Sequence, residues 1–311
     1  MPDLRVQFVA TKSTTSEPQR ATVRLFNLGK IHRDLIATYA RRPQGVSSIG
    51  LTVDGRVYQG TRVELLAGYE GLGGGSSAIF TGDLSVVRNQ HVGTEWVTTL
   101  ELGDSEAALT QAELDQSFPP GTPAIAVIQA ALARMGLLLG PAPVPEAVAA
   151  YVLTNGWAAY GRARDTIDAI LAGCAPDLSQ LPATIKAAAT LASLVGLLSG
   201  PSPMTRPVDL FVDDGLAYLQ PRHTALPGPP VQVSALAQPG TVRLLERPER
   251  LDDGGVRVRC LLTPGLRPAW PVSIVSKELA GLYRVEQAEQ AGDNRGGEFT
   301  TTAELRPVIP L

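Results

Sequence analysis

The clearest pattern of apolar and polar positions lies between Gln19 and Gly29. Its first half alternates with a period of two residues, which places apolar side chains on one face of a strand and polar ones on the other. A second alternating run, Leu4–Ala10, precedes it across a loop rich in Ser and Thr, so the two predict neighbouring antiparallel strands. Beyond Asn27, apolar residues lie four apart and predict a short helix. They are Ile31, Leu35 and Tyr39.

The rest of the chain continues as β, then mixed, then β. Short alternating runs predict four or five strands between residues 48 and 103, with Asp54-Gly55 as a hairpin turn. Helices are expected at 124–135, 165–172 and 184–198, followed by a hairpin at 210–219 around Asp213-Asp214-Gly215. Strands return between 231 and 306. The predicted class is α+β, mainly β, with boundaries at 1–104, 105–225 and 226–311.

Composition limits the classes of function. The net charge is −3 and the pI is about 5.7, so the chain lacks the basic surface that a nucleic-acid-binding domain needs. The start of the chain has no apolar signal segment, and the longest apolar run, 187–198, is shorter than the roughly 20 residues that span a bilayer. The two cysteines, Cys174 and Cys260, have apolar neighbours and are interpreted as reduced core thiols; a disulfide would require that they lie close in space.

Candidate catalytic and ligand-binding residues were weighed against structural roles. The three histidines, His32, His91 and His223, lie far apart without metal-ligand spacing, and Gly71–Gly75 lacks the Gly-Lys-Ser/Thr ending of a phosphate loop. The pairs Asp213-Asp214 and Asp252-Asp253 could serve as acid and base for glycoside hydrolysis, but each directly precedes Gly, where Asp favours a turn. No enzyme activity, cofactor or metal is therefore expected.

Four segments near the C-terminus follow one another in an order that resembles a known family. They are Arg257–Pro268, Trp270–Ser276, Gly281–Asp293 and Gly297–Glu304. This succession is similar to the C-terminal module of baseplate hub proteins of contractile-tailed phages: a strand ending in Leu-x-Pro, a Val-x-Ile-x-Ser strand, a Gly-Tyr-x-Val strand, a Gly-Asp turn and a polar return strand. Where many relatives carry His before the Gly-Asp, this chain has Gln290.

The resemblance implies two tube-like β modules flanking a smaller α+β domain. It also implies a structural hub, trimeric, that joins a sixfold tail tube to a threefold spike and lines the DNA conduit of a virion assembled in the bacterial cytoplasm. The implied partners are the tail tube, central spike and baseplate wedge proteins, with the tape measure protein as a further candidate. Two alternatives stay open: a β-sandwich hydrolase of cell wall or polysaccharide, and the tail-tip hub of a non-contractile phage.

Surface contacts were assigned in two places. The apolar stripe of the 187–198 helix, with Leu191, Leu194 and Leu198, is either a buried core face or a surface that docks on another subunit. The arginines on polar strand faces either contact a partner or are solvated. They are Arg24, Arg257 and Arg259.

Overall fold

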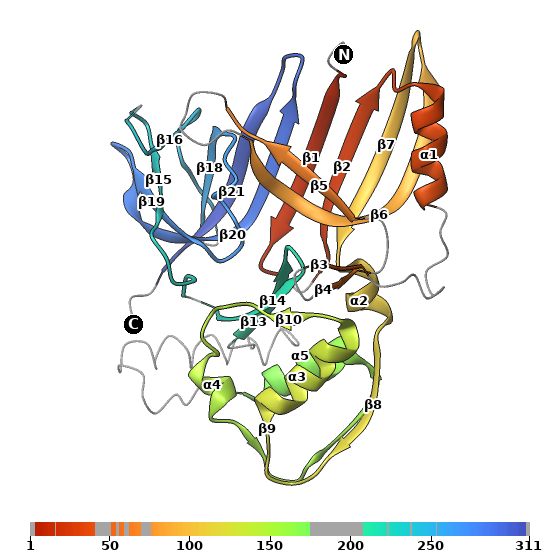
Figure 1. Ribbon diagram of the computed structural model, residues 1–311. Helices are drawn as coiled ribbons and strands as arrows, with labels where there is room; N and C mark the ends of the chain where they lie inside the picture. Colours follow the sequence, from red (N-terminus) through yellow and green to blue (C-terminus); the bar gives the residue numbers. More distant parts are fainter. Residues whose placement is uncertain are drawn as a thin grey trace. The chain divides into compact units, whose positions relative to one another are not determined.

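The chain was analysed as a computed structural model, which describes residues 4–15, 17–40, 51–53, 56–58, 62–69, 76–174, 208–222, 224–236, 238–252 and 254–308. Strands outnumber helices, and the sheets of the described residues form no closed barrel, which confirms the α+β, mainly β class. Clustering of contacts gives two compact units (Figure 1). Unit 1 contains residues 1–106, 211–216 and 223–311, and unit 2 contains residues 107–210 and 217–222.

The N-terminal part of unit 1 follows the predicted alternation. Strands β1 (Val6–Ser13) and β2 (Gln19–Phe26) pair antiparallel, and the other edge of β2 pairs antiparallel with β7. The order across this part is β1-β2-β7-β6-β5, with β5 (Arg62–Ala67), β6 (Ser77–Val92) and β7 (Glu95–Asp104). Strand β3 (Leu51–Val53) pairs antiparallel with β4 (Arg56–Tyr58), as a hairpin there requires, while the predicted turn at 54–55 lies outside the described residues.

Helix α1 (Lys30–Ala40) forms where it was predicted but turns a different face to the sheet. Ile36 packs against the core of unit 1, whereas Ile31 is 81% exposed and Leu35 is 51% exposed. The apolar residues four positions apart therefore predicted where the helix lies, but not which of its sides is buried.

The C-terminal part of unit 1 supplies the remaining strands of the same twelve-stranded sheet. They are β15 (Val231–Ser234), β16 (Val242–Arg243), β17 (Glu249–Arg250), β18 (Val256–Leu261), β19 (Pro271–Val275), β20 (Ala280–Asp293) and β21 (Phe299–Pro307). Strand β20 runs without a break to Asp293, and the chain turns only after that residue. Along one side it pairs with β21.

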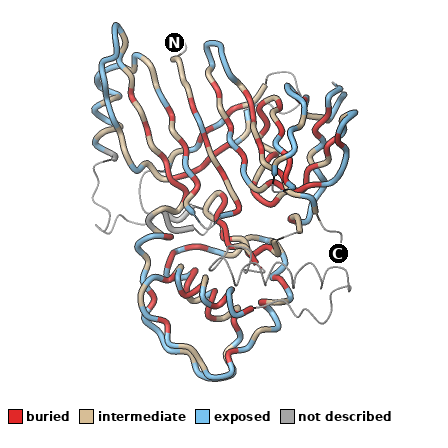
Figure 2. The backbone as a smooth tube through the Cα atoms, turned by 180° about the vertical axis from the view of Figure 1, so that it is seen from behind, coloured by how far each residue is buried: buried red, intermediate tan, exposed pale blue. Residues whose placement is uncertain are grey.

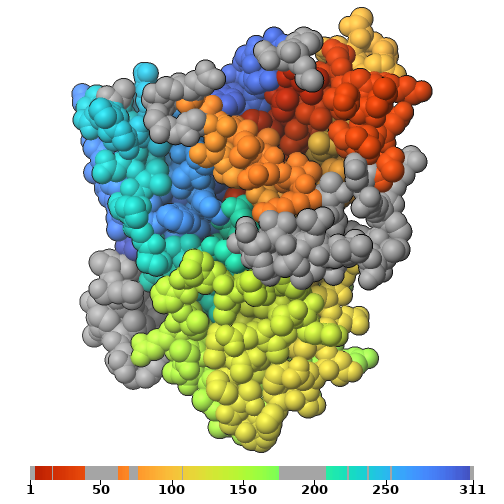
Figure 3. All heavy atoms as spheres, in the orientation of Figure 1, coloured from red at the N-terminus to blue at the C-terminus, as the bar shows by residue number. Residues whose placement is uncertain are grey.

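The other side of β20 joins the two ends of the sequence. Residues 280–284 pair with β19, and residues 287–293 pair with β1. Red and blue atoms consequently adjoin on the surface in Figure 3. The pairing is reinforced by Asp293, whose carboxylate accepts hydrogen bonds from Arg5 at 2.9 Å and Gln7 at 2.8 Å. These donors hold the pKa of Asp293 well below its usual range.

The large sheet has one buried and one polar face. Buried and exposed residues alternate along β1, β2 and β21 (Figure 2). The buried face carries two apolar clusters, one centred on Phe8 and Phe80 and the other on Val258 and Val285. The symmetry of the two β segments, and their assignment as separate tube-like domains at 1–104 and 226–311, stay predictions.

Unit 2 is the α+β part of the chain. Helix α3 (Ala124–Met135) packs against α5 (Ala163–Gly173), and α3 ends at Gly136 in the left-handed conformation, as the sequence predicts. The strand pair β8 (Glu113–Phe118) and β12 (Trp157–Arg162) was not predicted. The short elements are α2 (Glu106–Gln111), β9 (Thr122–Pro123), β10 (Leu138–Leu139), α4 (Glu146–Ala149) and β11 (Val152–Leu153).

The hairpin of β13 (Val208–Asp213) and β14 (Leu216–Pro221) also forms where predicted. Its tip, residues 211–216, is assigned to unit 1, and its remaining residues to unit 2. The predicted helix 184–198 lies outside the described residues.

Adding a side-chain carbon at Gly292 tests the packing where β1 pairs with β20. A Cβ there would lie 2.5 Å from two ring carbons of Phe8 and 2.8 Å from Phe299. We expect Gly292→Ala to lower the free energy of unfolding of unit 1 by about 1–3 kcal/mol, measured by urea denaturation, because overpacking displaces buried rings. The control is Gly29→Ala, whose Cβ meets only His32 at 3.5 Å. Equal stability of the two variants would contradict this packing.

Candidate functional site

The Asp213-Asp214-Gly215 segment, the candidate carboxylate pair, forms the turn between β13 and β14. Asp214 and Gly215 both have positive φ, 52° and 75°, as a two-residue hairpin turn of this kind requires. Asp tolerates this conformation better than most side chains, which explains why the sequence Asp-Gly marks the turn. The prediction of a turn is confirmed, and the carboxylates have a second role in addition.

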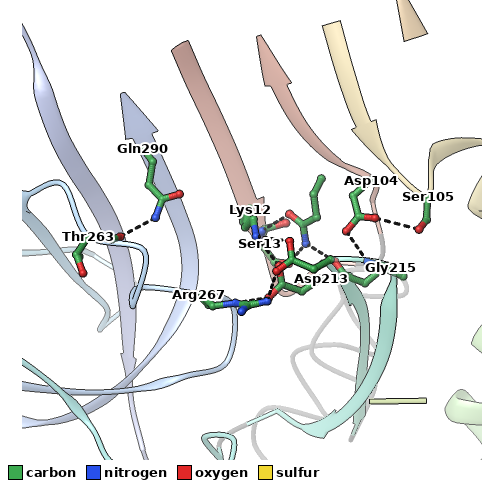
Figure 4. Close-up of polar contacts among 12 residues, drawn as sticks. Lys12, Ser13, Asp104, Ser105, Asp213, Gly215, Thr263, Arg267 and Gln290 are labelled. Atoms are coloured by element: carbon green, nitrogen blue, oxygen red, sulfur yellow. Dashed lines mark hydrogen bonds and ion pairs between the residues drawn. The ribbon is translucent and has the colours of Figure 1, made fainter. Parts of the chain in front are cut away.

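Both carboxylates are held by two cations (Figure 4). Lys12 of β1 lies 2.7 Å from Asp213 and 3.1 Å from Asp214, measured from Nζ to Oδ1. Arg267 donates from Nε to Asp213 Oδ2 at 2.7 Å and from Nη2 to Asp214 Oδ2. The side chains of Lys12 and Asp213 are only 4% and 2% exposed, so each charge depends on its partners. We call Lys12, Asp213, Asp214 and Arg267 the ion cluster.

A buried glutamine ties the same turn to the first two strands. Gln19 of β2 donates from Nε2 to the carbonyls of Ser13 at 2.7 Å and Val212 at 3.0 Å, and its Oε1 accepts from Ser13 N at 2.6 Å. Three of its hydrogen-bonding positions are therefore used by main chain. The turn is fixed by neutral as well as charged contacts.

Asp104, at the end of β7, borders the ion cluster. It is 4% exposed, and it accepts hydrogen bonds from Gly215 N at 3.2 Å and from Ser105 Oγ at 3.0 Å. Burial, reinforced by the negative charges of Asp213 and Asp214, raises the pKa of Asp104 to about 7. Asp104 was not singled out from the sequence, because it follows an ordinary alternating strand and its neighbours at 213–215 are distant in the chain.

The chemistry of this arrangement favours a structural role. Glycoside hydrolysis requires one carboxyl that donates a proton and another that acts from the opposite side of the bond. Asp213 and Asp214 are neighbours in one turn and share the same two cations. These two carboxylates therefore do not face each other across a substrate position.

The predicted surface arginines lie on the polar face of the large sheet, which also carries Glu. Arg257 pairs with Glu304 at 2.8 Å, and Arg259 pairs with Glu246 and Glu298, each at 2.6 Å. Across the strands, Arg20 pairs with Glu106 at 3.4 Å and Arg88 with Glu101 at 2.6 Å. Arg24 lies on the same face of β2, four residues along the strand from Arg20. The face is polar, and the arginines named in these ion pairs are neutralised by glutamates.

The remaining candidates do not converge on a site. Within the described ranges, no group of three His, Cys, Asp or Glu residues could hold a metal ion. Cys174 and Cys260 are free, buried thiols, and burial raises their pKa values to about 11 and about 12. His223, Asp253, Gly71–Gly75 and the helix with Leu191, Leu194 and Leu198 lie outside the described residues. In the part of the chain that the structure covers, no helix has the length and apolar character needed to cross a bilayer.

Gln290, which stands where the resembled family often has His, is a core residue. It is 2% exposed, and its Nε2 donates to the carbonyl of Thr263 at 2.7 Å (Figure 4). Among the described residues, its Oε1 has no hydrogen-bond partner. The position thus supports the loop that leads to Arg267.

No protein-family model matches the sequence, and no curated protein matches it. Solved structures do match. The 43 kDa tail protein of prophage MuSo2 from Shewanella oneidensis has a TM-score of 0.51 and 8% identity, covering 97% of each chain. A tail protein from Neisseria meningitidis MC58 has a TM-score of 0.54 and 9% identity, covering 96% of this chain and 91% of that one.

A third match is the E. coli c3393 protein, a component of the type VI secretion system that is described as similar in structure to the T4 phage tail proteins gp27 and gp5. Its TM-score is 0.54 and its identity 8%, over 99% of this chain and 74% of that one. At such low identity the likeness concerns the fold. The resemblance seen in the sequence is confirmed at that level: the chain has the fold of phage tail proteins.

The ion cluster can be tested by removing one partner. Lys12→Met leaves Asp213 buried with fewer cations, and we expect a loss of about 3–5 kcal/mol in the free energy of unfolding of unit 1. Asp213→Asn added to Lys12→Met should recover part of this loss. Arg20→Met, which breaks an exposed pair, should cost at most about 1 kcal/mol. Similar losses for Lys12→Met and Arg20→Met in chemical denaturation would refute the cluster's role.

Proposed function

We propose that this chain, which has the fold of phage tail proteins, is a structural tail protein that acts as a baseplate hub. The observation that carries the proposal is the match of nearly the whole chain to tail proteins and to a type VI secretion component. In this role the protein joins a sixfold tail tube to a threefold central spike. It is a component of the tail, assembled in the bacterial cytoplasm, with tube, spike and wedge proteins as neighbours.

The arrangement of strands supports a ring-forming subunit. The strand path of the large sheet ends at β5 and at β16, and among the described residues β5 pairs with β6 alone. Edge strands of this kind can pair with another chain. Head-to-tail contacts close into rings when their rotation permits. Three copies with two β segments each would present six segments to a sixfold tube.

The polar sheet face is the surface we assign to the conduit. DNA is gripped by cations that neutralise phosphates, so a conduit that lets DNA pass requires arginines that are already occupied. Arg257 and Arg259 meet this requirement through Glu304, Glu246 and Glu298. Their ion pairs keep the polar face hydrophilic without a net basic patch.

The first test of the hub is its oligomeric state. We expect sedimentation equilibrium to give a mass three times that of the 32.8 kDa chain, and particle images to show threefold symmetry at the baseplate. In those images the two β segments, 1–104 and 226–311, should alternate around the channel and superpose on one another. A monomer that stays monomeric with tube and spike proteins, or unrelated strand orders in the two segments, would contradict the hub.

The second test concerns DNA. Changing both partners of Arg259, Glu246→Gln and Glu298→Gln, should create salt-dependent binding of duplex DNA that the unchanged chain lacks. The slope of log K against log salt should steepen by about 0.9 for each phosphate that the variant neutralises. Fluorescence anisotropy measures both. The control pair Glu113→Gln and Glu146→Gln changes net charge equally at exposed positions of unit 2 and should leave binding unchanged. Equal binding by both pairs would refute this assignment of the face.

A further inference from the structure

The β13–β14 turn brings several acidic groups close together. Three carboxyl groups meet there, those of Asp104, Asp213 and Asp214. Among the described residues, the cations that contact them are Lys12 and Arg267. A buried carboxylate without a cation of its own is costly, so one of the three carboxyl groups is expected to bind a proton.

The geometry identifies which carboxyl group that is. Asp213 and Asp214 each contact both cations, whereas no Lys, Arg or His nitrogen of the described residues forms an ion pair with Asp104. In Figure 4, Asp104 lies on the Gly215 side of the turn and Arg267 on the other side. Its partners are Gly215 N and Ser105 Oγ, both uncharged.

Among the described residues, the charged groups nearest to Asp104 in the chain and across the turn are acidic. Glu106, two residues further on, lies over Gly103 on the opposite face of β7 and pairs there with Arg20. The charges that act on Asp104 are those of Asp213 and Asp214, and both are negative. They oppose the loss of its proton, in the same direction as burial does.

We propose that a proton on Asp104 holds the tip of the β13–β14 hairpin, residues 211–216, in its closed position. With the proton bound, Asp104 carries no charge beside Asp213 and Asp214, and the turn stays seated between β1 and β7. Loss of the proton places a third negative charge beside Asp213 and Asp214. Opening of the turn then becomes easier, because it exposes that charge to water.

The sign of the pH dependence follows from the direction of the shift. A carboxyl group that holds its proton more tightly in the closed state than in the open state stabilises the closed state at low pH. This stabilisation is lost as the pH rises, over the range from the ordinary Asp pKa near 4 to the value of about 7 in the closed turn. The opening constant should therefore increase by up to about tenfold per pH unit across this range and level off above it.

The experiment measures hydrogen exchange of the amides in residues 211–216 of the full chain between pH 5 and 8.5, corrected for intrinsic exchange. We expect their protection to fall with pH in the unchanged chain, and to be independent of pH above 5 in Asp104→Asn. The control is Asp83→Asn, which removes another buried carboxyl group of raised pKa, about 6, on β6 and should leave the dependence at 211–216 in place.

A second measurement can overturn the proposal with the unchanged chain alone. Carbon-13 spectra of chain labelled at Asp carboxyl groups should show one resonance that titrates near pH 7, and Asp104→Asn should remove it. Absence of any such resonance in the unchanged chain would overturn the proposal. Protection at 211–216 that is constant with pH, or that falls equally in Asp104→Asn, would overturn it as well.

Discussion

The structure of unit 1 depends on the division of one side of β20 between two partners. Residues 280–284 pair with β19 and residues 287–293 with β1, while the other side stays paired with β21. A bulge between Val285 and Gln287 falls at the changeover. It places Glu286 so that its carboxylate accepts from the fully buried Arg284 and, at 2.8 Å, from Thr14 Oγ1. The bulge residue thus ties β20 to the end of β1.

The pairing of β20 with β1 explains how residues from both ends of the chain make one sheet with a continuous polar face. Opposed residues in adjacent strands share a face, so Arg259, Thr302, Glu289, Thr11 and Arg20 form one row across five strands. Acids and bases alternate along that row with small hydroxyl side chains between them. A sheet of this kind can expose a wide polar face to water while its apolar residues stay on the other face.

Local patterns predicted most strands, the helices α1, α3 and α5, and the Asp-Gly turn, because period, caps and turn residues act over a few positions. Pairing between distant segments was not predictable: Lys12 and Asp213 are 201 residues apart. One signal was present, however. Phe8, Ala10 and Lys12 continue the same alternation, which places the Lys12 amine on the buried face. A lysine there requires a buried acid, although the sequence does not identify which one.

Asp213, the acid that Lys12 contacts, shows why a pair of carboxylates can resemble a catalytic site and still have a structural role. Asp suits the turn at 213–215 because of its backbone preferences, and a turn is narrow enough to enter the space between two strands. Once buried, the carboxylates are stable only where Lys12 and Arg267 meet them, so any other position of the turn leaves charges unpaired. The ion cluster therefore specifies where the hairpin docks more than it adds net stability.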